Sequence, residues 1–311
     1  MPTHITSFPS EQWLLNACVH LPDDEPQQRI GVVIVAEVTK FGRHGLFRQV
    51  AEAFAASGFY ALRFDNRGTH DSPGDCELTF DQRVSDACAA AHFLKTEYNL
   101  DKILFWGFCL GGALSVHASA RLSGQFTPAG MILCSLVVDP LDATLPEFNY
   151  KPTTFYSFAR NGLTGSVWAR LRQFVSDRGY RANVLKVASS MVRTYLRGNS
   201  ELQNMRTQFS RIGPLLAQYV GPTLLVYGDV DPYWPNFTKR INAGDRLGLS
   251  KMKSPPKIAV VPDGDHAFRS IQQRSAVIQM CVSWATALRD GQTLASHPEE
   301  IHAIFASSTA N

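Results

Sequence analysis

The segment from residue 102 to residue 114 is the feature that most constrains the fold. An apolar run typical of a buried strand leads into a Gly-x-Cys-x-Gly turn around Cys109, and a helical pattern follows at once. The flanking glycines allow the backbone to double back and present the thiol at the tip of a strand. A helix beginning at Leu110 directs its free N–H groups and positive dipole end toward the sulfur. The pattern predicts a reactive thiol at a strand-to-helix turn, with a structural buried cysteine as the alternative.

Apolar runs rich in Val, Ile and Leu recur along the chain and are too continuous for strands with one solvent face. They cover residues 29–38, 59–64, 102–108, 129–138, 222–227 and 256–261. Between them, residues 46–57, 80–98 and 110–122 place apolar side chains at helical spacing. This alternation predicts an α/β fold with a mostly parallel sheet flanked by helices and right-handed crossovers. Residues 12–21 are expected to add an antiparallel edge strand.

The alternation stops after residue 139. About eighty aromatic- and arginine-rich residues of mostly helical pattern precede the next strand, far more than an ordinary connection needs. We interpret residues 140–220 as a mostly helical lid or cap inserted after the sixth strand, with helices near 166–176, 182–197 and 201–217. Residues 1–139 and 221–311 then form the core. A helical subdomain that covers one face of the sheet without moving is the alternative.

Composition excludes several classes of protein. The chain has 311 residues, 45% of them hydrophobic and 18% charged, which is typical of a globular protein. Neither a signal peptide nor a membrane span is apparent. The cysteines lack the spacing of a disulfide framework or metal site, which favours a cytoplasmic location and no metal or cofactor; they are Cys18, Cys76, Cys88, Cys109, Cys134 and Cys281.

Charge is unevenly distributed. The net charge of +3 argues against a nucleic-acid partner. Residues 151–211, however, hold eleven Lys or Arg against only Asp177 and Glu201. A basic segment of this kind attracts anionic ligands, so an acyl group carried on coenzyme A or on an acidic acyl carrier protein is an expected partner. A solvated helical face explains the charge equally well. The oligomeric state is left open.

A thiol nucleophile needs a base, and the base needs an acid that orients it; in this architecture the chain order is nucleophile, acid, histidine. Turns with suitable side chains follow the last two expected strands. The first contains Asp229 and Asp231, and the second contains His266. Asp231 is favoured as the acid because it has more room to bend toward the histidine loop, whereas Asp229 is expected to bond its own backbone. Asp263 and Asp265 remain as alternatives that shape the loop around His266.

Other polar residues occur at expected strand ends. Glu37 follows the strand 30–36, where a carboxylate is costly unless it is paired or used. It either points to solvent or acts beside Cys109, accepting the thiol proton or repelling the thiolate. In the turn-rich segment 65–74, Asp65 and Arg67 are expected to form a salt bridge. The loop histidines His44 and His70 are weaker candidates for a functional role.

With elbow, acid and histidine in that order, the chain resembles the α/β-hydrolase superfamily over residues 30–122 and 222–288. Residues 107–113 and 35–37 resemble dienelactone hydrolases, and that resemblance gives Cys109, His266, Asp231 and Glu37 the places of triad and extra glutamate. Residues 59–68, 106–109 and 195–198 are similar to the hydrolases associated with exosortase systems. Dienelactone hydrolases lack the long insertion, and the usual His-Gly dipeptide of the oxyanion hole is replaced here by Ala36-Glu37-Val38. The resemblance implies oxyanion donors at Leu110 and at Val38 or Glu37.

The leading functional hypothesis is acyl transfer through a covalent acyl-enzyme, as in a thioesterase or esterase. Cys109 would attack the carbonyl, His266 would carry the proton, and Asp231 would orient the imidazole. Transfer to an amine or alcohol is an alternative, as is lactone hydrolysis of the dienelactone type. A non-catalytic binding protein on the same scaffold ranks last.

Overall fold

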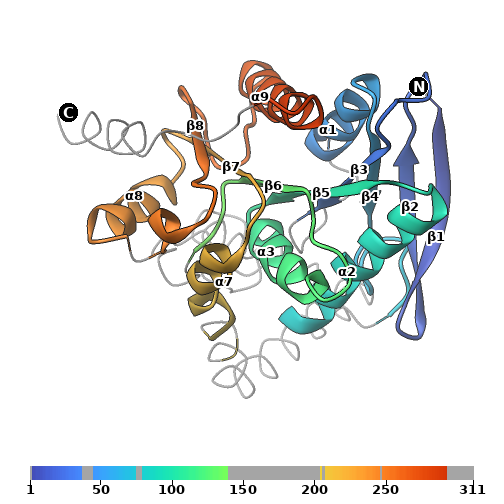
Figure 1. Cartoon of the computed structure of the whole chain (residues 1–311), viewed down its shortest axis with the longest axis horizontal. Coiled ribbons are helices and arrows are strands. Elements are labelled where there is room, and N and C mark those ends of the chain that lie inside the picture. The colour runs from blue at the N-terminus through green and yellow to red at the C-terminus, as the bar shows by residue number, and fades with distance from the viewer. Residues whose placement is uncertain are drawn as a thin grey trace, which may run out of the picture. The chain divides into compact units, whose positions relative to one another are not determined.

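The computed structural model describes residues 2–36, 45–74, 79–138, 204, 207–245 and 247–292. Within these residues, one sheet has the strand order β1-β2-β4-β3-β5-β6-β7-β8 (Figure 1). The strands are β1 (Thr3–Ser10), β2 (Trp13–His20), β3 (Ile30–Val35), β4 (Tyr60–Phe64), β5 (Lys102–Phe108), β6 (Gly130–Cys134), β7 (Thr223–Gly228) and β8 (Lys257–Val261).

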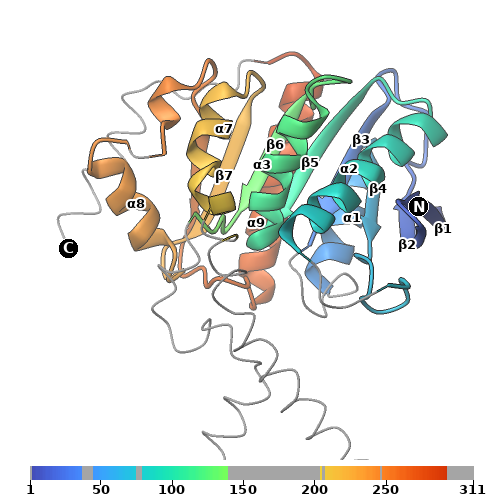
Figure 2. The same cartoon turned by 90° about the horizontal axis from the view of Figure 1, so that it is seen from below.

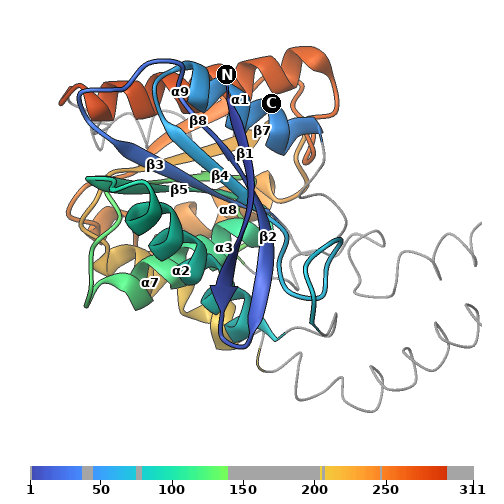
Figure 3. The ribbon, with the colours of Figure 1, turned by 90° about the vertical axis from the view of Figure 1, so that its right-hand side faces the viewer.

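From β4 to β8 all neighbouring strands run parallel, which confirms the predicted mostly parallel sheet. The central strands β3, β6 and β7 are buried at every residue because helices cover both faces of the sheet, so their apolar runs show no alternation. The antiparallel edge contains one strand more than the sequence predicted: β1 pairs with β2 as a hairpin (Figure 3). The polar side chains of β1 gave little apolar signal, since most of them face solvent.

Helices lie on both faces of the sheet. In Figure 1 and Figure 2, α1 and α9 lie on one face, whereas α2, α3 and α7 lie on the other. Two of them begin with capping boxes, Thr79 with Gln82 at α2 and Ser270 with Gln273 at α9, which satisfy N–H groups of the first turn. The helices are α1 (Gly45–Ala56), α2 (Phe80–Glu97), α3 (Leu110–Leu122), α7 (Ile212–Gln218), α8 (Trp234–Asn242) and α9 (Ile271–Arg289), with a 3-10 turn η1 (Leu249–Lys251).

The chain divides into one unit of Met1–Val138 with Gln208–Asn311 and a second of Asp139–Thr207. Apart from Asn204 and Thr207, the residues of the second unit lie outside the described ones, so the predicted lid and its helices near 166–176 and 182–197 are not described. Helix α7 falls within the predicted lid range 140–220 and belongs to the same unit as the sheet. No helix among the described residues is long and apolar enough to cross a membrane.

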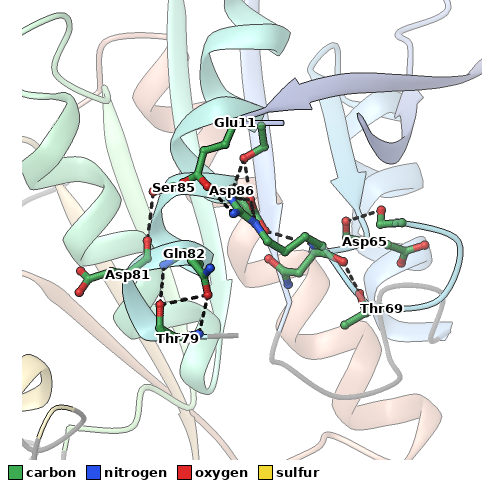
Figure 4. A network of polar contacts seen from close by, with 12 residues as sticks. Glu11, Asp65, Thr69, Thr79, Asp81, Gln82, Ser85 and Asp86 are labelled. Carbon is green, nitrogen blue, oxygen red and sulfur yellow. Dashed lines mark hydrogen bonds and ion pairs between the residues drawn. The ribbon is translucent and has the colours of Figure 1, made fainter. Parts of the chain in front are cut away.

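A buried ion-pair network braces the loop after β4. The predicted salt bridge between Asp65 and Arg67 is wrong: the Arg67 guanidinium pairs with Asp86 of α2 at 2.6 Å and with Glu11 of the β1–β2 turn at 2.6 Å. Asp86 is fully buried, so its carboxylate needs a cation and hydrogen-bond donors close by. Figure 4 shows Glu11 and Asp86 in this network, and Asp65 at the start of the loop after β4.

Candidate active site

Cys109 occupies the sharp turn between β5 and α3. Its backbone has φ 55° and ψ −119°, a conformation that residues other than glycine rarely adopt. Its N–H donates to the Cys134 carbonyl at 2.9 Å, and its carbonyl accepts from the Gly112 N–H at 3.1 Å. These bonds hold the strained residue at the carboxyl end of β5, where ligands of open parallel sheets bind. Cys109 is 5% exposed.

Close backbone packing explains why glycines surround this cysteine. A Cβ on Gly111 would lie 2.0 Å from the Val35 carbonyl oxygen, and a Cβ on Gly107 would lie 2.6 Å from the Gly111 carbonyl oxygen. Val35 ends β3 and pairs with Gly107 in the sheet. The start of α3 therefore packs directly against the end of β3, and only glycine fits at these contacts.

Asp231 and His266 form an acid–base pair at the same edge of the sheet. Asp231 follows β7, His266 follows β8, and Nδ1 of the imidazole lies 3.1 Å and 3.2 Å from the two carboxylate oxygens. The carboxylate also accepts the Tyr233 N–H at 2.9 Å, which fixes its orientation. Asp231 is 1% exposed. With Nδ1–H donating to this carboxylate, Nε2 is the nitrogen left to accept a proton.

The other aspartates of these turns shape the loops. Oδ1 of Asp229 accepts the Gly264 N–H at 3.1 Å, so it joins the two loops rather than bonding its own backbone as the sequence predicted. A Cβ on Gly228 would lie 1.9 Å from the Gly264 carbonyl oxygen, which shows how closely the loops approach. Asp265 accepts the Ala267 and Arg269 N–H groups, a local turn that agrees with its predicted role in shaping the loop.

Consecutive residues at the end of β6 anchor both Cys109 and His266. Cys134 accepts the Cys109 N–H, and the hydroxyl of Ser135 donates to the His266 carbonyl at 3.3 Å. The Phe108 ring, next to Cys109 in the chain, lies 5.5 Å from the imidazole by ring centroids. The backbones of Cys109 and His266 are thus hydrogen-bonded to two consecutive residues at the end of β6.

Aromatic side chains that sequence reasoning missed surround the imidazole. The Tyr233 ring lies 5.0 Å from His266, so the imidazole contacts both Tyr233 and Phe108. Tyr233 comes two residues after Asp231, and that proximity in sequence was the available signal. These two rings pack against the imidazole and limit its rotation.

Tyr227 lies on β7 close to the same groups. Burial raises the pKa of its phenol well above the ordinary value, and the charge of the Asp231 carboxylate raises it further. The phenol therefore stays neutral and donates to the Leu136 carbonyl at 2.8 Å. This bond ties β7 to the segment that follows β6.

The predicted oxyanion donors are described only in part. Leu110 is the first residue of α3, and the N–H groups of a first helical turn have no acceptor within the helix. Glu37, Val38 and His44 lie outside the described residues. His70, with φ 46°, places Nδ1 3.6 Å from an Asp65 oxygen in the loop after β4. Among the described residues, no group of three or more His, Cys, Asp or Glu side chains is arranged to hold a metal ion.

Solved structures with the same fold are numerous. Est1E from Butyrivibrio proteoclasticus, solved with ferulic acid bound, aligns at a TM-score of 0.59 and 15% identity over 89% of this chain and 98% of its own. A dienelactone hydrolase from Anabaena variabilis aligns at a TM-score of 0.55 and 14% identity, over 91% of this chain and 96% of its own. DcsB, solved in complex with its substrate analogue, aligns at a TM-score of 0.58 and 12% identity, over 93% of this chain and 99% of its own. At these identities the likeness shows the fold.

Sequence comparison gives the family directly. No curated protein matches the chain. A sequence profile of the alpha/beta hydrolase family matches residues 41–279, which span β4 to β8 and both turns that carry Asp231 and His266. The profile match covers well over half of the chain and agrees with the sheet order and the strand-to-helix turn. The chain belongs to the alpha/beta hydrolase family.

Proposed function

We propose that this hydrolase works by acyl transfer through a thioester formed on Cys109, with His266 as the base and Asp231 as the residue that orients it. The observation that carries the proposal is the strained Cys109 backbone, φ 55° and ψ −119°, at the end of β5. Strain of this kind is costly and is typical of positions where a side chain must project toward a substrate.

The proposed reaction uses the geometry of the two loops. The Cys109 thiol gives its proton to Nε2 of His266 while the sulfur bonds the substrate carbonyl carbon. The imidazolium, bonded through Nδ1 to buried Asp231, then protonates the leaving thiol or alcohol. In the second half His266 takes a proton from water while the water oxygen bonds the acyl carbon; the carbon–sulfur bond then breaks, the imidazolium returns the proton to the Cys109 sulfur, and the carboxylic acid leaves. The Leu110 N–H, at the positive end of α3, would bind the oxyanion.

Chemistry and charge favour a thioester or an activated ester as substrate. Sulfur exchanges readily with thioesters, and the segment 151–211 holds eleven Lys or Arg against two acidic residues. A basic segment favours an acyl group attached to an anionic carrier such as coenzyme A or an acidic carrier protein.

Trapping the acyl-enzyme tests the proposal. Incubation with p-nitrophenyl esters and acyl thioesters, followed by intact mass and peptide mapping, should give an acyl adduct on Cys109. Cys109→Ala should abolish both adduct and turnover. Cys88→Ala, which removes another buried thiol, on α2, should keep both. Full turnover by Cys109→Ala would overturn the proposal. Release of the adduct by an added amine or alcohol, but not by water, would assign acyltransferase activity.

A further inference from the structure

A second group of reactive side chains lies on β2 and β4, away from Cys109. Cys18 and Arg63 are register partners in the antiparallel β2–β4 pair, and His20 follows two residues later on the same face of β2. The Cys18 Sγ lies 3.6 Å from Nε2 of His20 and 3.5 Å from Nη2 of Arg63. Strands β4 and β3 separate β2 from β5 in the sheet.

The direction of these hydrogen bonds assigns the sulfur the role of acceptor. Nε of Arg63 donates to Nε2 of His20 at 3.0 Å. Burial and, to a lesser extent, the charge of Arg63 together lower the pKa of His20 from 6.5 to about 4, so the imidazole is neutral and Nε2 can accept. A guanidinium has only donors, so Nη2 of Arg63 directs an N–H and a positive charge at the sulfur. The positive charge of Arg63 therefore lies where it can attract an anionic partner of the thiol.

Cys18 is also the accessible thiol among the described cysteines. It is partly exposed, whereas the others are buried, namely Cys88, Cys109, Cys134 and Cys281. Its register partner on β1 is Ile5, whose side chain is 83% exposed. Directly paired residues share one face of a sheet, so this face is open to solvent beside Cys18. Figure 3 shows β2 next to the edge strand β1.

We propose that Cys18 is a site of reversible modification, at which it forms a mixed disulfide with a small disulfide that carries carboxylates. The Cys18 thiolate attacks one sulfur of that disulfide, its proton having gone to solvent. A bond forms between the two sulfurs, the original disulfide bond breaks, and the second half leaves as a thiolate. Arg63 supplies the positive charge that selects a carboxylate-bearing partner.

The test compares an anionic with a neutral disulfide on the full-length protein. The protein is incubated with oxidised glutathione or with hydroxyethyl disulfide at equal concentration. Peptide mapping then measures the adduct on each cysteine and separates Cys18 from Cys76 and Cys109. The quantity compared is the rate of adduct formation with oxidised glutathione divided by the rate with hydroxyethyl disulfide. We expect this ratio to be about fivefold higher for Cys18 than for free cysteine, because opposite charges attract at short range. Arg63→Gln should remove this preference, Arg63→Lys should keep it, and the distant Arg121→Gln should leave it unchanged.

Several results would overturn the assignment: no Cys18 adduct on the folded protein, equal relative rates with both disulfides, or a preference that survives in Arg63→Gln. If circular dichroism shows that Arg63→Gln does not fold, the wild-type protein is tested at increasing salt concentration instead. Salt screens the charge of Arg63, so the preference for oxidised glutathione must fall. A ratio insensitive to salt then rejects the proposal. Cys109→Ala should label at Cys18 at the wild-type rate, which keeps this test independent of the proposed acyl transfer.

Discussion

At the scale of single residues, the position of one carboxylate decides which nitrogen of His266 can work as a base. Asp231 is buried, and its carboxylate accepts a hydrogen bond from Nδ1 of His266. The same carboxylate also accepts the Tyr233 N–H. Asp229, two residues earlier, is bonded to Gly264. Two aspartates in one turn therefore have separate roles, one toward the imidazole and one toward the neighbouring loop.

Asp231→Asn is expected to lower kcat by about 10⁴-fold, because an amide can hold the imidazole in the wrong tautomer and does not stabilise the imidazolium. Asp229→Asn keeps an oxygen that can accept the Gly264 N–H, so its kcat should change by less than about tenfold. Steady-state kinetics on an activated ester, with circular dichroism to confirm folding, measures both. Equal losses in the two variants would contradict the assignment of Asp231.

A second residue-scale prediction concerns His20, whose pKa falls from 6.5 to about 4 through burial and the charge of Arg63. Between these values the unfolded chain binds a proton that the folded chain does not. Stability should therefore fall as the pH drops from 6.5 to 4, by at most about 3 kcal/mol. Urea unfolding at several pH values should show a smaller decrease for His20→Gln. Identical pH profiles for the two proteins would show that His20 titrates normally.

At the scale of elements, the junction of β3, β5 and α3 depends on backbones that approach without side chains between them. Gly111, in the first turn of α3, lies against the Val35 carbonyl, and this contact holds the helix start beside Cys109. Displacement of the helix would move both the thiol and the N–H groups of the first turn. The stability of this junction and the geometry of the candidate site are therefore linked.

Gly111→Ala should cost about 3 kcal/mol or more, since its Cβ would lie 2.0 Å from the Val35 oxygen and the strand or helix must shift. Gly124→Ala is the matched control, because nothing lies within 4 Å of its Cβ, and it should change stability by less than about 0.5 kcal/mol. Chemical unfolding gives both values. A Gly111→Ala variant as stable as Gly124→Ala would show that this junction is loose.

At the scale of the whole molecule, the Arg67 network joins segments far apart in the chain. Its guanidinium, in the loop after β4, contacts Asp86 on α2 and Glu11 in the β1–β2 turn, and Ser10 donates to Asp86 at 2.6 Å. The edge hairpin, the loop at the carboxyl end of β4 and a covering helix are thereby held in one arrangement (Figure 4).

Asp86→Asn should destabilise the protein by about 3–5 kcal/mol, because it removes one partner of a buried ion pair and leaves Arg67 poorly compensated. Asp81→Asn breaks a pair with Arg121 at 3.2 Å that is about half exposed, and should cost less than about 1 kcal/mol. Urea unfolding followed by far-UV circular dichroism compares the variants. Similar small losses in both would mean that water compensates Arg67.

The sequence by itself determined the features that depend on short-range patterns. Continuous apolar runs predicted the parallel strands because helices bury both sheet faces, and the glycines around Cys109 predicted the strand-to-helix turn. Strand order along the chain then placed Asp231 and His266 in turns at the same sheet edge, since the carboxyl ends of parallel strands share one edge.

Only the tertiary structure decided which side chains meet. Arg67 pairs with Asp86 rather than Asp65, β1 joins the sheet despite a polar pattern, and Cys18 contacts Arg63 through the β2–β4 register. The Arg67–Asp86 and Cys18–Arg63 contacts join residues 19 and 45 positions apart, where local preference gives no signal, whereas β1 is next to β2 in the chain and its solvent-facing residues hid it. The buried Asp86 carboxylate needs a cation beside it, because an unpaired buried charge costs free energy, and this selects Arg67 as its partner. The β2–β4 register, set by which residues face the core, selects Arg63 as the neighbour of Cys18.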